Sequence, residues 1–410
     1  MDQTGGGQAR KGHYRGTHRL CDPAVTVERL TSLMPAFGIT RVANLTGLDR
    51  LGIPVVMVCR PNARSSAVFH GKGLDIAAAK ASGLMEAIET WHAEHVDLPL
   101  RYGSHRQLAV SSQVADVERL PLLPGRSFDR DAQILWVEAK DIAAGGPVLV
   151  PFEVVHMDGT SRNAPEARCL SVSTNGLASG NHGLEATSHA ICELIERDAT
   201  SLWHQRSLHE QRATRIDPDT IEDTDSRALL RTYGEAQFDV GLFDLSSDIA
   251  VPVVLAMALD RGGEMAHSGL GVGCHPMPEI ALLRALTEAA QVRTTYIAGS
   301  REDITHDDYS SATLSRRHRL TETLLSGERP SRRFVELGGA RFAAFSEEVD
   351  WLIGRLRAAG LAQVLVVDLS RPDYGVPVVR ALVPGLEGSD HHGGYSPGGR
   401  SRAQSAGRRP

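Results

Sequence analysis

Acidic and amide side chains recur at one spacing in three separate segments of the chain. Each segment places a polar residue at position i, a carboxylate at i+4, and a carboxylate or amide at i+7. The three sets are Ser82, Glu86 and Glu89; His189, Glu193 and Glu196; and Arg284, Glu288 and Gln291. In an α-helix these positions share one face, within roughly 60° of arc. The spacing therefore predicts three helices, each with a narrow polar stripe.

Apolar residues surround the stripes, such as Leu84 and Ile88 in the first segment and Ile191 and Ile195 in the second. Such helices are mostly buried, and a buried carboxylate without a partner is very costly, so we expect the stripes to face cations. The alternative is that each helix faces solvent and makes ordinary salt bridges, because a single E-x-x-E spacing is common on surface helices. Recurrence of the spacing in three segments favours a shared site.

The chemistry of the stripes indicates a hard metal ion and phosphate. Carboxylate and amide oxygens suit Mg²⁺ or Ca²⁺ better than zinc or copper. Arg197, Arg284 and Arg293 stand among the acids, as expected where a metal bridges phosphate to the protein and arginine holds the remaining oxygens. A metal-dependent hydrolase or a glycosidase-like carboxylate pair is the alternative, although the acids outnumber those of a two-carboxylate mechanism. The third helix, with Arg284 and Gln291, is the better candidate for holding phosphate.

Established nucleotide-binding signatures are absent from the sequence. It contains no G-x-x-x-x-G-K-[ST] motif, and neither of its Gly-x-Gly turns continues to the third glycine of a dinucleotide-binding turn. Any ATP site must therefore be of an unrelated kind.

An internal repeat predicts the elements that position these helices. A polar turn followed by Pro-Val-Val occurs three times, at Pro54, Pro252 and Pro377, and predicts three β-hairpins whose second strand begins at the proline. Glycine-rich turns open the helices, which we align from Gly73, Gly180 and Gly273. Strands that alternate with helices predict an α/β or α+β fold, with antiparallel hairpins.

Composition excludes several classes of protein. The net charge of -6 over 410 residues argues against nucleic acid as the main partner. No apolar run is long enough to cross a membrane and the N-terminus is not a secretory signal, so we expect a soluble, cytoplasmic protein. The five cysteines lie far apart, which supports neither a zinc site nor a disulfide framework. We expect residues 1–10 and the Gly-, Ser- and Arg-rich residues 389–410 to be flexible, and residues 301–335 to form a surface excursion.

Several motifs together resemble the YcaO family. They are Ser82-x-x-x-Glu86-x-x-Glu89, Asn175-Gly-x-Ala-x-Gly-Asn181 continuing through Glu185 to Glu193-x-x-Glu196-Arg197, Arg284-x-x-x-Glu288-x-x-Gln291, the segment from Arg15 to His18, and Val376-Pro-Val-Val-Arg-x-x-Val-Pro-Gly-Leu-Glu387. The resemblance covers roughly residues 11–388, which we take as one YcaO domain.

The resemblance implies a YcaO-type fold around a central site for ATP and Mg²⁺. It implies an enzyme that phosphorylates the oxygen of a peptide backbone amide. A neighbouring Cys, Ser or Thr side chain then gives an azoline, and an external sulfur source gives a thioamide. The substrate is expected to be a ribosomally made precursor peptide or a protein.

The resemblance also assigns roles to residues that match the family motifs. The magnesium ligands it implies are Glu86, Glu89, Glu185, Glu193, Glu196 and Glu288. The nucleotide and phosphate contacts it implies are Ser82, Asn181, Arg197 and Arg284, together with Lys11 or Arg15 from the N-terminal segment. It does not identify the general base.

Two departures from the family pattern matter. Thr90 stands where many members have arginine, so one phosphate contact is expected to be lost or supplied elsewhere. The C-terminus lacks the proline-rich tail of many azoline formers, and we expect no room for a fused peptide-clamp domain ahead of residue 11. These last two features resemble the branch that works with a separate TfuA-like partner, for which thioamide formation is inferred. The alternatives are an azoline-forming cyclodehydratase, an accessory factor for ribosomal protein methylthiolation, and a non-catalytic peptide-docking subunit. We also expect a homodimer.

Three other features have weaker support as functional groups. His391 and His392 form a pair in a polar tail without a third metal ligand nearby. Cys274 could relay sulfur, but a small buried side chain is the simpler interpretation. His189 takes the place of Ser82 in the helix register, where it contacts either the nucleotide or the protein core.

Overall fold

The structure, a computed structural model, describes residues 9–160, 169–261, 268–388 and 396–406. The chain divides into two compact units. The first unit comprises residues 1–10, 88–205 and 342–410, and the second comprises residues 11–87 and 206–341. The boundary falls inside one helix, α2 (Ile76–Glu94).

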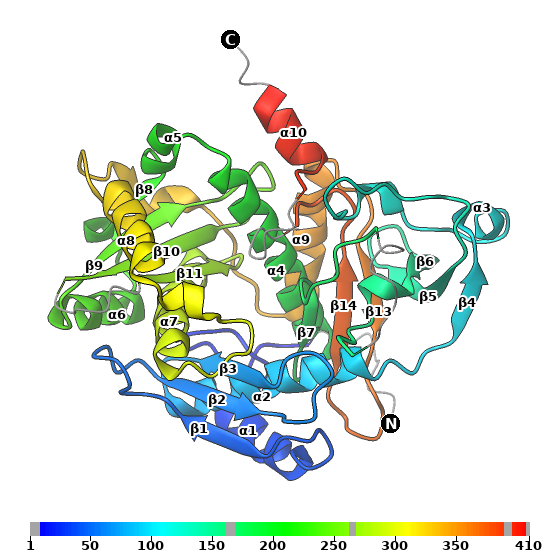
Figure 1. The fold of residues 1–410 in the computed structure, drawn as a ribbon, viewed down its shortest axis with the longest axis horizontal. Helices are drawn as coiled ribbons and strands as arrows, with labels where there is room; N and C mark the ends of the chain where they lie inside the picture. Colours follow the sequence, from blue (N-terminus) through cyan, green and yellow to red (C-terminus); the bar gives the residue numbers. More distant parts are fainter. Residues whose placement is uncertain (1–8, 161–168, 262–267, 389–395, 407–410) are drawn as a thin grey trace. The chain divides into compact units, whose positions relative to one another are not determined.

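The first unit is built on one antiparallel sheet (Figure 1). Its strands, in spatial order, are β4 (Leu100–Gly103), β5 (Ile134–Asp141), β13 (Leu365–Asp368), β14 (Val378–Leu382) and β7 (Leu177–Ser179), and β6 (Pro147–Pro151) pairs with β5. Its helices are α3 (His105–Leu108), α4 (Gly183–His204), α9 (Phe345–Ala358) and α10 (Gly399–Ala406). Ala186 and Ala190 of α4 pack on β7 and β14, in one buried cluster with Ala178 and Ala381 of these strands.

The second unit contains two sheets (Figure 1). The strands of the smaller are β1 (Arg41–Asn44), β2 (Val55–Cys59) and β3 (Val68–Lys72); those of the larger, in order, are β11 (Gly269–Cys274), β10 (Val253–Asp260), β9 (Phe238–Asp244), β8 (Arg215–Asp217) and β12 (Arg332–Arg333). The helices are α1 (Pro23–Leu33), α5 (Leu208–Arg212), α6 (Thr224–Glu235), α7 (Pro278–Ala298) and α8 (Ser311–Leu325). The apolar face of α7 packs on β10 and β11 and forms much of the core. The predicted surface excursion contains α8.

The three Pro-Val-Val segments form the same hairpin, which confirms the repeat. In each turn the side-chain Oδ1 of an Asn or Asp residue accepts a hydrogen bond from the backbone N–H two residues later, at 2.8–3.0 Å. The hydroxyl of that later residue accepts from the first strand residue after the proline, at 3.0–3.2 Å. In chain order the three residues of each hairpin are Asn44, Thr46 and Val55 in the first; Asp244, Ser246 and Val253 in the second; and Asp368, Ser370 and Val378 in the third. These side chains thus fix one turn geometry three times.

Each Pro-Val-Val strand pairs with the strand that leads into one of the three predicted helices. β2 pairs with β3 before α2, β10 pairs with β11 before α7, and β14 pairs with β7 before α4. In the third repeat the chain order is permuted, because β7 and α4 precede β13 and β14 in the sequence. The predicted α+β fold with repeated hairpin and helix units is confirmed.

The backbone register corrects one of the anchor residues used to align the helices. The N–H groups of Gly73, Gly180 and His275 donate to the carbonyls of Pro54, Pro377 and Pro252, at 3.1–3.3 Å. His275, two residues after Gly273, is therefore the structural equivalent of Gly73 and Gly180. From these three residues the stripe begins at the same distance, nine residues later, in every helix.

Two glycines allow the helices to approach the strands closely. A Cβ atom on Gly71 would lie 2.0 Å from the carbonyl oxygen of Ala79, and one on Gly273 would lie 2.1 Å from that of Ala281. Any larger residue would push the helix away from the strand.

The C-terminal segment that we expected to be flexible contains α10, which is anchored on α4. Arg400 Nε donates to Asp198 Oδ1 at 2.9 Å, and the Glu387 carboxylate accepts from the backbone of Gly398 and Ser401 at 2.6 and 2.8 Å. Composition alone missed these buried anchors. His391 and His392 lie outside the described residues. Among the residues described, no helix is both long enough and apolar enough to span a bilayer.

Candidate functional site

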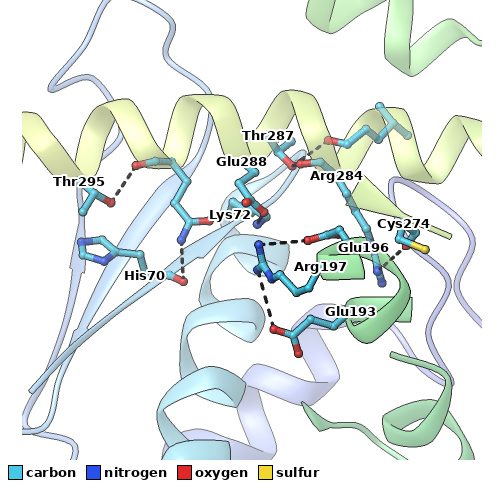
Figure 2. Close-up of polar contacts among 12 residues, drawn as sticks. His70, Lys72, Glu193, Glu196, Arg197, Cys274, Arg284, Thr287, Glu288 and Thr295 are labelled. Carbon is cyan, nitrogen blue, oxygen red and sulfur yellow. Dashed lines mark hydrogen bonds and ion pairs between the residues drawn. The ribbon is translucent and has the colours of Figure 1, made fainter. Parts of the chain in front are cut away.

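The polar residues of α4 make two sets of contacts in the first unit. Glu185 and Glu196 are only 2% and 7% exposed. Arg197 lies 3.8 Å from Glu193 and 3.6 Å from Glu196, as Figure 2 shows. Asn181 Nδ2 donates to Glu185 Oε1 at 3.3 Å. The first unit thus brings the α4 acids together with Arg197 and Asn181.

Glu89 is held at the end of β7. The backbone N–H and the hydroxyl of Ser179 both donate to Glu89 Oε1, each at 2.8 Å. Ser179 stands two residues before Asn181, so Glu89 lies beside the turn that opens α4. The sequence motifs did not single out Ser179, although it borders the glycine-rich turn.

Arg380 is a buried cation next to the α4 stripe that sequence reasoning also missed as a site residue. It is 2% exposed, and burial lowers the pKa of its guanidinium to about 10, while the charge of Glu193 acts in the opposite direction. Its Nη2 donates to the carbonyl of Ser173 at 2.6 Å, and its Nε and Nη1 have no hydrogen-bond partner among the described residues. Gly176 donates to Glu193 at 3.1 Å, so Arg380 and Glu193 hold the two ends of one turn.

In the second unit, the acid of α7 faces a lysine. Glu288 Oε2 forms an ion pair with the ammonium of Lys72, the last residue of β3 (Figure 2). The feature of the sequence that could have identified Lys72 is its place between Gly71 and Gly73. We had used this Gly-x-Gly segment only to mark a turn.

The other two residues of the α7 stripe donate to backbone carbonyls of β11 and β3. Arg284 Nη1 donates to the carbonyl of Cys274 at 3.1 Å, and Gln291 Nε2 donates to that of His70 at 3.3 Å (Figure 2). Cys274 is fully buried.

Arg293, which we had placed among the phosphate-clamping arginines, has a different role. It is buried, it pairs with Asp260 at 2.8 Å and lies 3.6 Å from Asp49, and its guanidinium stacks over Phe238 at 4.8 Å. These contacts place Arg293 in the core, so the phosphate-clamp hypothesis is wrong for this residue. Periodicity explains the error, because Arg293 is two residues beyond the stripe and points to another face.

The stripe of α2 is divided by the unit boundary. Ser82 and Glu86 belong to the second unit. The hydrogen bond that Arg301 donates to Asp303 is the main cause that raises the pKa of Arg301, and the charge of Glu86 adds to it. Glu89 belongs to the first unit, as described above. Thr90 is buried.

The N-terminal segment brings one of its two candidate residues to the start of α7. Lys11 is buried, and its Nζ lies 3.1 Å from His18 Nδ1. The ring of His18 stacks edge-on against that of His275. Burial, together with the charges of Lys11 and Arg284, lowers the pKa of His18 to about 4, so His18 is neutral and can accept from Lys11. Arg15 is exposed and is not brought to this cluster.

The donor chemistry of these stripes fits Mg²⁺. The acids offer carboxylate oxygens on rigid helices, which is what a hard divalent cation requires. Cationic side chains next to the acids, such as Arg197, Arg284 and Lys72, are suited to phosphate oxygens.

Residues 70–387 match the model of a protein family described as YcaO cyclodehydratase, ATP- and Mg²⁺-binding. The chain belongs to the YcaO family. This membership confirms the predicted family and the predicted cofactors, ATP and Mg²⁺.

Related sequences and a solved structure support the same family. An uncharacterized protein in the tfuA 3′ region of Rhizobium leguminosarum bv. trifolii is 36% identical over 377 residues, covering 90% of this chain and 88% of the relative. A protein of Methanothermobacter thermautotrophicus is 37% identical over 375 residues, covering 89% and 94%. YcaO from Methanopyrus kandleri, solved with AMPPCP and Mg²⁺, superposes with a TM-score of 0.73 at 25% identity, covering 92% of this chain and 95% of that one.

A heterocyclase solved with substrate and cofactor shares the fold. The TM-score is 0.78 at 22% identity, over 93% of this chain. The chain spans 54% of the length of that heterocyclase.

Proposed function

We propose that this YcaO protein uses ATP to phosphorylate a peptide backbone amide and that sulfur then replaces the activated oxygen to give a thioamide. The amide oxygen attacks the γ-phosphorus, and ADP leaves. A hydrosulfide-level sulfur donor adds to the amide carbon, the carbon–oxygen bond breaks, and phosphate departs with the former amide oxygen. No oxidation or reduction is needed.

The observation that supports amide activation is the repeated register of the three helices. Their acids are proposed to hold Mg²⁺: Glu86, Glu89, Glu185, Glu193, Glu196 and Glu288. Their polar partners Ser82, Asn181, Arg197 and Arg284 are proposed to hold the nucleotide and its phosphates. Lys11 or Arg15 of the N-terminal segment is proposed to join them, and Lys11 is the one that lies near the start of α7. When bound, Mg²⁺ would neutralise charge on the phosphates and polarise the transferred group. The arginines would stabilise the charge that develops on the transferred phosphoryl group. The YcaO domain is proposed to span residues 11–388.

The thioamide product and the TfuA-like partner are supported by one relative. That relative lies in a tfuA 3′ region and is 36% identical to this chain. Azoline formation is the second candidate, supported by the fold shared with a heterocyclase. The two chemistries use the same activated amide and differ in the nucleophile.

Co-expression with a candidate precursor peptide and a TfuA-like protein tests the proposal. Exchange of one oxygen for sulfur in the intact mass of the peptide is expected, and loss of water would indicate an azoline instead. ADP formation should require both Mg²⁺ and peptide. A protein that binds AMPPCP but never forms ADP with any peptide would be a docking subunit, and modification seen only on a ribosomal protein would indicate the accessory role in methylthiolation.

A further inference from the structure

Lys72 places a positive charge directly on one of the proposed magnesium ligands. It ends β3, and its ammonium contacts the Glu288 carboxylate of α7, 216 residues away in the chain (Figure 2). The two side chains are only 23% and 22% exposed. The lysine is therefore a partly buried member of the candidate site and not a fully solvated surface residue.

The structural repeat shows that this position has a counterpart. Lys72 pairs with Val55, and in the third repeat Ser179 pairs with Val378, so Lys72 and Ser179 are equivalent strand-end residues. Ser179 donates two hydrogen bonds to Glu89, another proposed metal ligand. Two repeats therefore use the same strand end to hold a carboxylate of a different helix.

The two strand-end residues differ in what they permit. A neutral serine can keep its hydrogen bonds while the carboxylate also binds a cation. An ammonium on the same carboxylate repels a divalent cation, and the repulsion is strong at short range in a partly buried site. Lys72 and Mg²⁺ therefore compete for Glu288.

The displaced ammonium cannot move far. Gly71 fixes the end of β3 against α2, since a Cβ there would lie 2.0 Å from Ala79, so only the four-carbon stem of Lys72 can swing. With Mg²⁺ held by Glu288, phosphate oxygens of the nucleotide would offer the ammonium a new anionic partner. Lysine binds such oxygens as a point charge.

We propose that Lys72 is a phosphate-binding residue whose ammonium neutralises Glu288 before Mg²⁺ arrives and then transfers to a phosphate oxygen of the nucleotide. This inference rests on the proposed role of Glu288 as a metal ligand. It adds a cation that the family motifs quoted above do not include.

Two binding measurements on the full chain test the transfer. Binding of Mn²⁺ without nucleotide, followed by electron paramagnetic resonance, reports competition at Glu288, because Mn²⁺ shares the preference of Mg²⁺ for oxygen ligands. Calorimetry with AMPPCP at saturating Mg²⁺ reports the phosphate contact. In Lys72→Met, Mn²⁺ affinity should rise about fivefold as the competing charge is lost. AMPPCP affinity should fall about tenfold as the phosphate contact is lost.

The opposite signs of the two shifts identify the mechanism. Lys72→Arg, which keeps the charge, should leave both affinities within about threefold of the wild type. Lys140→Met, on the exposed face of β5, is the matched control and should change neither. An unchanged AMPPCP affinity in Lys72→Met would overturn the proposal, and so would a fall of both affinities together with a lower thermal midpoint, which would indicate a structural salt bridge.

Neither measurement uses a peptide, so the result is independent of amide activation. If both shifts occur but no peptide ever stimulates ADP formation, the assigned reaction fails and the role of Lys72 stands. If Glu288→Gln leaves Mn²⁺ affinity unchanged, Glu288 is not a ligand and the role of Lys72 fails with it.

Discussion

Helices α4 and α7 carry the same spacing of polar residues but hold it in different ways. On α4 the acids interact with Arg197 of the same helix, and the segment just before the helix supplies Asn181 and Gly176. On α7 every stripe residue binds a neighbouring strand, β3 or β11, through Lys72 or a backbone carbonyl. The α4 acids thus find these partners nearby in the chain, while the α7 stripe depends on strands from two sheets. The same motif in sequence therefore has two kinds of support in the fold.

The largest effect should come from the buried acid of α4. Glu196→Gln removes a carboxylate that is 7% exposed and proposed to bind metal. Peptide-stimulated ADP formation should fall about a hundredfold to a thousandfold, because the charge of the transferred phosphoryl group is no longer compensated. Steady-state ADP release measures the effect. Glu138→Gln, exposed on β5, should retain full activity; equal losses in both variants would refute a special role for Glu196.

Substitutions of Arg293 and Arg284, both on α7, should affect different properties: the first the free energy of unfolding, the second the affinity for nucleotide. Arg293→Met leaves Asp260 and Asp49 buried beside an apolar side chain, and the free energy of unfolding should fall by about 3–5 kcal/mol. Urea denaturation measures this change, and AMPPCP affinity of the folded protein should be little altered.

Arg284→Met should give the reverse pattern. Its guanidinium is bonded to one backbone carbonyl, so stability should change by less than about 1.5 kcal/mol. AMPPCP affinity should fall about tenfold because a proposed phosphate contact is lost. If Arg293 and not Arg284 controlled nucleotide affinity, the correction made from the structure would itself be wrong.

The sequence predicted the three helices, their stripes and the hairpins, because these features depend on periodicity and on local turn chemistry. It failed where the deciding contact is remote in the chain. Arg293 is held in the core by the remote acids Asp260 and Asp49, and Lys72 gains a role only through Glu288. The alignment from Gly273 failed for a related reason, since strand register and not glycine spacing determines which residue begins each repeat.

Asp198 of α4, which accepts from Arg400 of α10, should make a moderate contribution to stability that depends on pH. Burial raises the pKa of Asp198 from 3.8 to about 6, opposed by Arg400. Between about pH 4 and pH 6 the folded protein therefore binds more protons at this residue than the unfolded chain does, so its contribution to stability declines as pH rises through that window.

Asp198→Asn should remove that decline, which amounts to about 3 kcal/mol for a raised pKa of this size. Urea denaturation at pH 4.5 and pH 7 measures the greater part of it, about 2 kcal/mol. Asp350→Asn, exposed on α9, is the control and should keep the wild-type slope. An unchanged slope in Asp198→Asn would mean that α10 does not hold this carboxyl in a buried state.

The smallest effect should come from the strand end that carries no charge. Ser179→Ala removes one of two hydrogen bonds to Glu89 and leaves the backbone N–H in place, so Mn²⁺ affinity should fall only about threefold. Lys72→Met at the equivalent position should move the same affinity upward. Parallel titrations of both variants followed by electron paramagnetic resonance make the comparison. Shifts of the same sign would show that the two strand ends act alike, and the charge at Lys72 would then have no separate function in metal binding.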